Sequence, residues 1–164
     1  MERITKERLE QFVRYEPTTG LLTWIISPGG RAKIGATVGS KHSRGYREAR
    51  IDGCRLFVHQ AVWVLMTGSW PSHQIDHING DRSDNRWGNL RAAMQYQNSA
   101  NMRRRPSNQS GFKGVVKTNK NGWTAYIHVS GKTRYLGVFS TPEAASAAYE
   151  NAAREAWGEY ARAA

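Results

Sequence analysis

Residues 75–98 contain few apolar side chains and many Asp, Asn and His side chains. Asp76 and His77 are adjacent, and Asn89 and Asn98 follow His77 after 12 and 21 positions. A neutral imidazole can deprotonate water near neutral pH, and a second amide can fix its tautomer. A hard divalent cation prefers carboxylate and amide oxygens, and with two protein ligands it keeps positions open for phosphate and water. The stretch therefore suits hydrolysis of a phosphodiester, although a polar loop without chemistry would have a similar composition.

The wider pattern resembles the HNH motif of phage and intron-encoded homing endonucleases. The resemblance covers residues 59–101 and rests on Asp-His-Ile-Asn-Gly-Asp, Asp-Asn-Arg, Asn-Leu-Arg and Gln-Asn, with asparagine in place of the last histidine of the family name. That family folds the motif as a ββα-metal finger. The resemblance implies that Asp76 and Asn98 bind one divalent metal, with Mg²⁺ expected and Mn²⁺ as the alternative. It also implies that His77 is the general base and that Asn89 orients it.

Other polar residues around this motif have simpler interpretations. His59 begins an apolar helical pattern, so a core or capping histidine is the default, and a supporting role beside the site, which the resemblance suggests, is the alternative. Asp81, Asp84 and Asn85 are expected to be turn and capping residues, because Asx side chains stabilise such loops. Arg86 and Arg91 could both contact a phosphate, and Arg91, directly after Asn-Leu, is the stronger candidate.

The whole chain has 164 residues and a formal net charge of +11, which favours a polyanionic partner such as nucleic acid. No apolar run reaches the roughly 18 residues that a membrane span needs, and the N-terminal sequence lacks the pattern of a signal peptide. We therefore expect a cytoplasmic protein, in a bacterial host cell if it is phage-encoded as the resemblance implies. The single cysteine, Cys54, excludes an internal disulfide and a multi-cysteine site, so no structural zinc is expected.

The sequence predicts an α+β chain with four segments. Residues 1–53 form an N-terminal strand and helix module, 54–102 the HNH core with its ββα-metal fold, 103–110 a basic linker, and 111–164 a further folded unit. Before the linker we expect helices over 5–15, over 59–66 and within 90–101, strands over 21–26, 45–51 and 55–58, and a polar, turn-rich stretch over 69–89. In the linker, Arg103, Arg104 and Arg105 are expected to track phosphates, and a merely solvated linker is the alternative.

Residues 111–164 have a different pattern. Apolar and polar residues alternate in three runs, 114–117, 123–129 and 133–139, which Asn-Gly and Ser-Gly turns separate. These runs predict a three-stranded antiparallel sheet. A helix should follow, capped by Thr141 and ended by Gly158, with alanines that allow close packing on the sheet.

This C-terminal unit resembles the DNA-binding domain of plant ethylene-response transcription factors, through Phe-Lys-Gly-Val, Trp-Thr-Ala, Tyr-Leu-Gly-Val-Phe and a Glu-Ala-Ala helix. That fold lays the open face of its sheet into the major groove of DNA. The resemblance puts Lys113, His128 and Tyr135 at DNA-contact positions, and we add Lys117 and Arg134 as phosphate contacts. Other contact positions lack the usual charged residues, so the plant target sequence does not transfer. A small folded module without DNA-binding is the alternative.

The two resemblances together imply a metal-dependent, homing-type HNH endonuclease that cuts duplex DNA by single-metal, general-base catalysis. The cut DNA would carry 5′-phosphate and 3′-hydroxyl ends. One active site per chain suggests a monomer or a weak homodimer. The alternative is a non-catalytic DNA-binding regulator that retains the HNH scaffold. An RNA nuclease is less favoured, because the sequence offers no obvious row of aromatic side chains on which single-stranded bases would stack.

Overall fold

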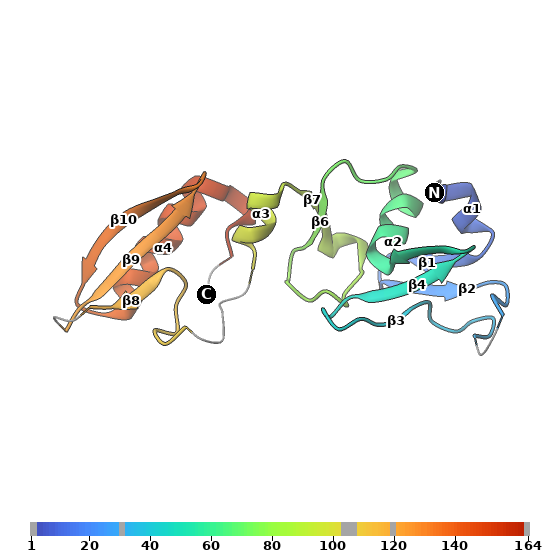
Figure 1. The fold of residues 1–164 in the computed structure, drawn as a ribbon, viewed down its shortest axis with the longest axis horizontal. Coiled ribbons are helices and arrows are strands. Elements are labelled where there is room, and N and C mark those ends of the chain that lie inside the picture. The colour runs from blue at the N-terminus through green and yellow to red at the C-terminus, as the bar shows by residue number, and fades with distance from the viewer. Residues whose placement is uncertain (1–2, 30–31, 103–107, 119–120, 163–164) are drawn as a thin grey trace. The chain divides into compact units, whose positions relative to one another are not determined.

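The computed structural model describes residues 3–29, 32–102, 108–118 and 121–162 (Figure 1). The chain divides into two compact units, residues 1–93 (the first unit) and 94–164 (the second unit). Both combine short helices with small antiparallel sheets, which confirms the α+β prediction. In the described part of the chain, no helix is long and apolar enough to cross a membrane. The division falls ahead of the expected linker, and Arg103, Arg104 and Arg105 lie outside the described residues, so the four-segment organisation stays a prediction.

The first unit begins with a single helical turn and a hairpin. Its elements are α1 (Lys6–Glu10), β1 (Val13–Glu16) and β2 (Leu21–Trp24). The expected helix over 5–15 is wrong beyond Glu10, because Val13 pairs with Trp24, and Tyr15 with Leu22, in an antiparallel ladder. β-branched and aromatic residues fit a half-buried strand better than a helix, and the pairing buries Val13, Leu22 and Trp24 in the core.

The expected second hairpin and the expected helix follow, and a short strand that was not predicted extends the hairpin to a three-stranded sheet. The sheet consists of β3 (Ser40–Lys41), β4 (Arg47–Ile51) and β5 (Cys54–Phe57), in that order. Asp52 and Gly53, both with positive φ, make the turn between β4 and β5. The helix, α2 (Val58–Thr67), ends at a left-handed Gly68. Its buried face joins the hairpin and the sheet in one apolar core, which includes Leu9, Leu22, Val38, Ile51, Val62 and Val64.

The stretch expected to be only polar and turn-rich contains a strand. β6 (Gln74–His77) pairs antiparallel with β7 (Leu90–Ala93), and the 3-10 helix η1 (Trp87–Asn89) leads into β7. Gln-Ile-Asp-His has no apolar alternation, because two of its three buried side chains, Asp76 and His77, are polar. Pattern reasoning therefore could not find β6, whereas the resemblance to a ββα finger implied a strand pair.

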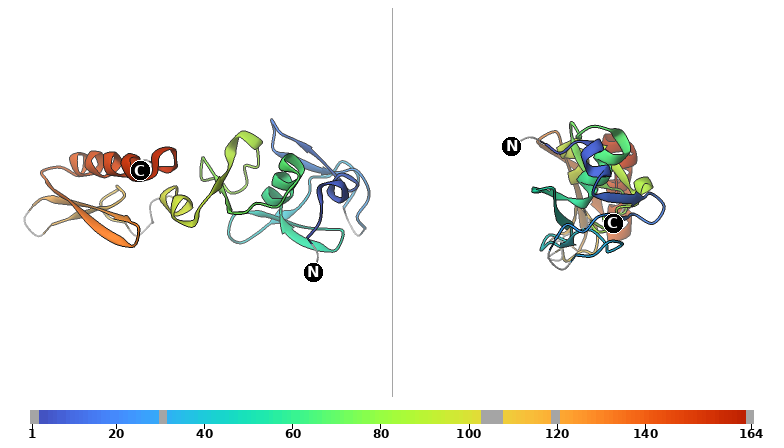
Figure 2. Two further views of the ribbon diagram at one scale, coloured as in Figure 1. Left: turned by 90° about the horizontal axis from the view of Figure 1, so that it is seen from above. Right: turned by 90° about the vertical axis from the view of Figure 1, so that its right-hand side faces the viewer.

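The second unit has the predicted sheet and helix. It comprises α3 (Gln95–Ala100), β8 (Val115–Lys117), β9 (Trp123–Val129), β10 (Lys132–Phe139), α4 (Pro142–Trp157) and η2 (Gly158–Tyr160). β9 is the central strand, and α4 runs along one face of the sheet (Figure 2). Thr141 caps α4 by accepting a hydrogen bond from Ala144 N. Small buried residues such as Ala125 and Ala145 allow the close packing of helix and sheet.

Candidate active site

Strands β6 and β7 hold an acidic and a basic side chain directly opposite each other. Asp76 pairs with Arg91 in the β6–β7 register. Arg91 Nε and Nη2 each lie 2.9 Å from Asp76 Oδ2. The two side chains are only 5% and 13% exposed, so this is a buried ion pair whose carboxylate faces a cationic group. Arg91, predicted to contact a phosphate, is thus engaged with the predicted metal ligand.

His77 ends β6 with its ring buried, only 4% of the residue being exposed. Its Nε2 lies 3.3 Å from Oδ1 of Asn85, which is buried as well. Burial lowers the pKa of His77, against the opposing influences of the Asn85 hydrogen bond and of nearby Asp76 and Asp81. A histidine whose pKa is lowered is neutral at neutral pH, which is the form that can accept a proton from water.

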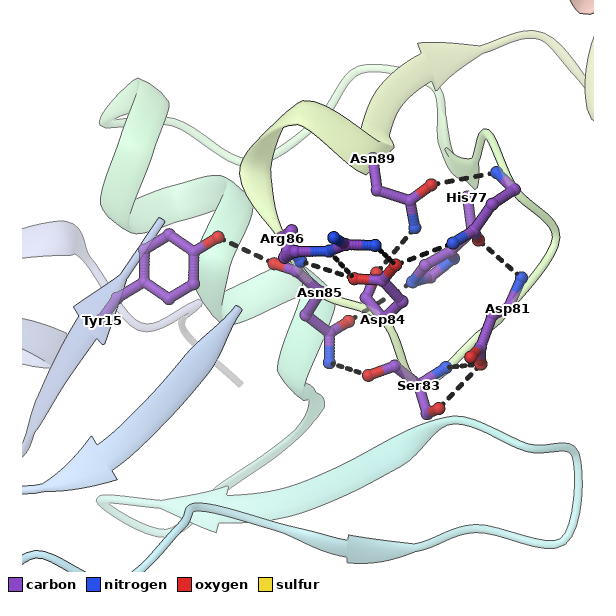
Figure 3. Close-up of polar contacts among 9 residues, drawn as sticks. Tyr15, His77, Asp81, Ser83, Asp84, Asn85, Arg86 and Asn89 are labelled. Atoms are coloured by element: carbon purple, nitrogen blue, oxygen red, sulfur yellow. Dashed lines mark hydrogen bonds and ion pairs between the residues drawn. The ribbon is translucent and has the colours of Figure 1, made fainter. Parts of the chain in front are cut away.

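The Asn89 side chain forms two hydrogen bonds with the loop that connects β6 to η1 (Figure 3). Its Oδ1 accepts a hydrogen bond from Asn79 N at 2.9 Å, and its Nδ2 donates one to Asp84 O at 2.8 Å. Both contacts are to the loop backbone. The predicted role of Asn89 in orienting His77 stays a prediction, and Asn85 is the amide that the structure brings to the imidazole.

Carboxylates shape the same loop as turn residues, as expected. Asp81 Oδ1 accepts hydrogen bonds from the backbone N and the hydroxyl of Ser83, at 2.9 and 2.7 Å. Asp84 forms a two-point ion pair with Arg86, at 2.8 and 2.6 Å. The hydrogen bond from Arg86 is the main reason why the pKa of Asp84 is lowered to about 2. Asp81 and Asp84 thus stabilise the loop as expected. Asn85 was expected to be a turn residue as well, but its side chain contacts His77.

The N-terminal hairpin, β1 and β2, also contacts the segment between β6 and β7. The Tyr15 hydroxyl, on β1, donates a 2.7 Å hydrogen bond to Asn85 O (Figure 3). Trp87 N donates to Pro17 O at 3.1 Å. Gly20, with φ +74°, lies so close to the loop that an added Cβ would be 2.5 Å from Arg86 N. The hairpin is therefore part of the site's framework.

An aromatic cluster covers His77. The His59 ring packs edge-on against it with centroids 5.2 Å apart, and Tyr46 lies 5.0 Å from His59 and 5.9 Å from His77. Phe57 stacks on His59 at 5.5 Å. His59 is buried, and its Nδ1 has no hydrogen-bond partner among the described residues. Burial, followed by the charge of His77, lowers the pKa of His59 to about 3. His59 is thus a neutral ring beside the site, in contact with the predicted base.

The predicted metal ligands lie in different units. Asp76 is on β6 of the first unit, and Asn98 is on α3 of the second, so their meeting at one cation stays a prediction. Within the described residues, no three His, Cys, Asp or Glu side chains gather as a metal-binding group. A carboxylate and an amide oxygen nevertheless suit a hard divalent cation. In this structure Arg91 occupies Asp76 Oδ2, so a cation at this carboxylate would compete with the guanidinium.

The second unit leaves one face of its sheet open. Side chains alternate along β9, so that Ala125 and Ile127 pack toward α4 while Tyr126 and His128 are exposed. The open face consists of Val116, Tyr126, His128, Thr133, Tyr135 and Val138, and Lys117 nearby is exposed as well. Tyr126 and Tyr135 face each other across the strands, with ring centroids 5.6 Å apart. His128, Tyr135 and Lys117, three of the expected DNA contacts, are therefore accessible.

The other two expected DNA contacts of this unit turn toward their own chain. Lys113 Nζ donates hydrogen bonds to Ala100 O at 3.0 Å and Arg162 O at 3.3 Å. Burial lowers the pKa of Lys113 to about 8. Arg134 Nη2 lies 3.4 Å from Glu155 Oε2 on α4. Their contact with DNA stays a prediction that would require these bonds to be exchanged.

Comparison with known proteins finds a family match in the region that contains Asp76, His77 and Asn89. Residues 56–100 match a family model described as HNH endonuclease. The chain is 33% identical over 109 residues to an uncharacterized HNH endonuclease of Acanthamoeba polyphaga mimivirus, covering 65% of this chain and 56% of that protein. It is 32% identical over 106 residues to protein 3.8 of Escherichia phage T7, covering 63% of this chain and 87% of that protein. The alignment with the mimivirus protein therefore spans little more than half of that relative, and no solved structure matches this chain.

Proposed function

The chain belongs to the HNH endonuclease family, and from that premise we propose that it hydrolyses phosphodiester bonds of duplex DNA with His77 as the general base. One observation carries this proposal. His77 is a buried imidazole with a lowered pKa, adjacent in sequence to a buried carboxylate and held by an amide. Such a histidine is neutral when DNA is bound near neutral pH, and it can take the proton of an attacking water.

The reaction needs one bond made and one broken. The water oxygen bonds to phosphorus while its proton passes to the imidazole of His77. The bond between phosphorus and the 3′ oxygen breaks, and solvent supplies the proton that makes the 3′-hydroxyl. The products carry 5′-phosphate and 3′-hydroxyl ends. Asn89 holds the loop that follows His77, through its bonds to Asn79 N and Asp84 O.

Asp76 and Asn98 would hold a divalent cation, Mg²⁺ before Mn²⁺. When bound, the cation supplies charge neutralisation at the phosphate and at the leaving oxygen. Arg91 pairs with Asp76 from the neighbouring strand, and its guanidinium would bind a phosphate oxygen once it is released from that carboxylate.

The second unit would hold the enzyme on its target, as in a homing-type nuclease. The open face presents accessible Tyr135 and His128, and Lys117 is exposed on the first strand of the same sheet. The net charge of +11 supports binding to a polyanion. Targeting by this sheet rests on the resemblance to plant DNA-binding domains.

The test is cleavage of supercoiled plasmids that carry fragments of the source phage or host genome. We expect relaxed or linear DNA with Mg²⁺ or Mn²⁺, and intact plasmid with EDTA or with His77→Ala. Retention of the same DNA in a gel shift without any cutting would contradict the proposal and favour a non-catalytic regulator. Cutting of RNA alone would favour an RNA nuclease.

A further inference from the structure

The side-chain amide of Asn85 has a defined orientation. Asn85 is only 3% exposed, and its Nδ2 donates a hydrogen bond to Ser83 O at 3.2 Å. A carbonyl oxygen can only accept, so the amide nitrogen must point toward Ser83 and Oδ1 must point the other way. Oδ1 then faces His77 Nε2 at 3.3 Å (Figure 3).

This orientation has a consequence for the imidazole. An amide oxygen cannot donate, so the ring nitrogen that meets it must carry the proton. In a neutral imidazole the lone pair is then on Nδ1. We propose that Asn85 is a positioning residue that fixes His77 as the Nε2-protonated tautomer, with Nδ1 as the basic nitrogen, and that Tyr15 holds Asn85 in place. The inference rests on the proposed function of His77 as a base, but the tautomer itself can be observed without any cleavage.

Tyr15 connects this arrangement to the N-terminal hairpin. Its hydroxyl donates to Asn85 O at 2.7 Å across 70 residues of sequence. Burial raises the pKa of Tyr15 to about 12, so the hydroxyl remains a donor at every pH at which the protein would act. Pro17 O and Gly20 contact the next residues of the same loop. The hairpin thus fixes the backbone on which the Asn85 amide is carried.

His59, the other imidazole of this cluster, does not fix the tautomer of His77. It meets His77 edge-on at a centroid distance of 5.2 Å, and its own Nδ1 lacks a hydrogen-bond partner among the described residues. It fills space beside the imidazole, whereas Asn85 provides a polar contact to a named ring nitrogen. Partners that orient metal-bound histidines are typically worth about 10- to 100-fold in activity, and we expect a similar factor for Asn85.

The experiment is ¹⁵N NMR of the histidine rings near pH 7.5, with the His77 signals assigned by their loss in His77→Gln. We expect wild type to show a protonated Nε2 and an unprotonated Nδ1. Asn85→Leu, which has a similar shape without the acceptor, should give a mixture of tautomers. Asn85→Asp, which keeps an acceptor in the same place, should keep the Nε2-protonated form.

Tyr15→Phe removes only the hydroxyl that donates to Asn85 O. We expect it to shift His77 toward the mixture of tautomers less than Asn85→Leu does. Tyr126→Phe, at an exposed tyrosine of the second unit, is its matched control and should leave the His77 signals unchanged. In cleavage assays we expect kcat to fall about tenfold or more in Asn85→Leu, with KM unchanged, and to stay within about threefold in Asn85→Asp.

A protonated Nδ1 in wild type would overturn the inference, and this result needs no variant to fold. An unchanged His77 tautomer in a folded Asn85→Leu would overturn it as well. Failure of the wild-type protein to cut any DNA, together with the expected tautomer pattern, would instead reject the nuclease function and leave the positioning contact standing.

Discussion

Asp76 and Arg91 occupy opposing positions of the β6–β7 ladder, and both Nε and Nη2 of Arg91 lie 2.9 Å from the same carboxylate oxygen. The predicted metal ligand therefore has a buried cationic partner. Two roles foreseen for separate residues, metal binding and phosphate contact, meet in one ion pair. A phosphate contact by Arg91 would replace its contact with Asp76, which makes the pair the first target for mutation.

Arg91→Gln should destabilise the first unit strongly. Removing one partner of a buried ion pair leaves an uncompensated charge and typically costs about 3–5 kcal/mol. Urea unfolding in EDTA measures this cost, and Asp76→Asn in the same background should recover much of it. Arg86→Gln is the matched control. Its pair with Asp84 is more exposed, with Arg86 at 55%, so the expected loss is below about 1 kcal/mol. Equal losses for the two arginines would contradict the burial argument.

Acid should destabilise the protein through His59. Its folded pKa, about 3, lies below the ordinary value of 6.5, so the unfolded chain binds the proton more readily. The stabilisation is complete above pH 6.5 and is lost as the pH falls toward 3, at up to about 1.4 kcal/mol per pH unit. The lowered pKa of His77 acts in the same direction. His59→Phe keeps a ring without a titrating group and should flatten the dependence of unfolding free energy on pH.

His73→Phe is the control for this measurement, because His73 is an exposed residue of the same unit. It should leave the acid dependence as in wild type. An unaltered slope in a folded His59→Phe would show that the acid sensitivity arises elsewhere.

Gly20→Ala should disturb the loop that carries Asn85. Its φ is +74°, and an added Cβ would lie 2.5 Å from Arg86 N and 2.8 Å from Asn85 C, both backbone atoms. We expect a loss of more than about 2 kcal/mol, since a side chain here is both strained and obstructed. Gly53→Ala has a similar φ, +76°, with open space around it, so strain alone should cost about 1 kcal/mol. The difference in unfolding free energy between the two variants, measured by thermal unfolding, gives the cost of the steric clash at Gly20 apart from the cost of positive φ.

Tyr135→Ala should weaken DNA binding with little effect on folding. Tyr135 is 58% exposed on the open face, so its removal changes few buried contacts. Fluorescence anisotropy with a DNA fragment that the protein retains should show about tenfold weaker binding, which corresponds to about 1.4 kcal/mol. Val138 is equally exposed, at 58%, on the same face. Val138→Ala therefore shows how much binding is lost when an aliphatic side chain is removed there instead of an aromatic one. Unchanged affinity in Tyr135→Ala would argue against this face as the DNA-binding surface.

The C-terminal sheet and helix were predictable because each element carries its own local signals. Alternation defined β9, a threonine and a proline defined the start of α4, and Asn-Gly and Ser-Gly placed turns where Asn121 and Ser130 have positive φ. The helix expected over 5–15 was wrong because Val13 and Tyr15 obtain a better partner in β2, a tertiary effect that local periodicity does not contain.

At the site, the sequence identified the side chains but not their partners. The motif singled out Asp76 and His77, and the structure buries both. The partner of His77 was missed, since Asn85 has the residue type of an ordinary turn and its contact depends on how the loop folds back. Its position within Asp-Asn-Arg, inside the motif, was the only available signal. Lys113 was expected to reach DNA by position alone, and its bonds to Ala100 O and Arg162 O arise from chain segments that a linear pattern cannot bring together.

The most direct test of the central claim is the single-turnover rate of DNA cleavage with Mg²⁺ for wild type, His77→Ala and His73→Ala. General-base catalysis contributes about 10²- to 10⁴-fold, so His77→Ala should be slower by that factor. His73→Ala, which removes an exposed histidine four residues earlier, should cleave at the wild-type rate. The ends made by wild type should be rejoined by DNA ligase, which requires 5′-phosphate and 3′-hydroxyl ends. A wild-type rate in His77→Ala would contradict the assignment of His77 as the base.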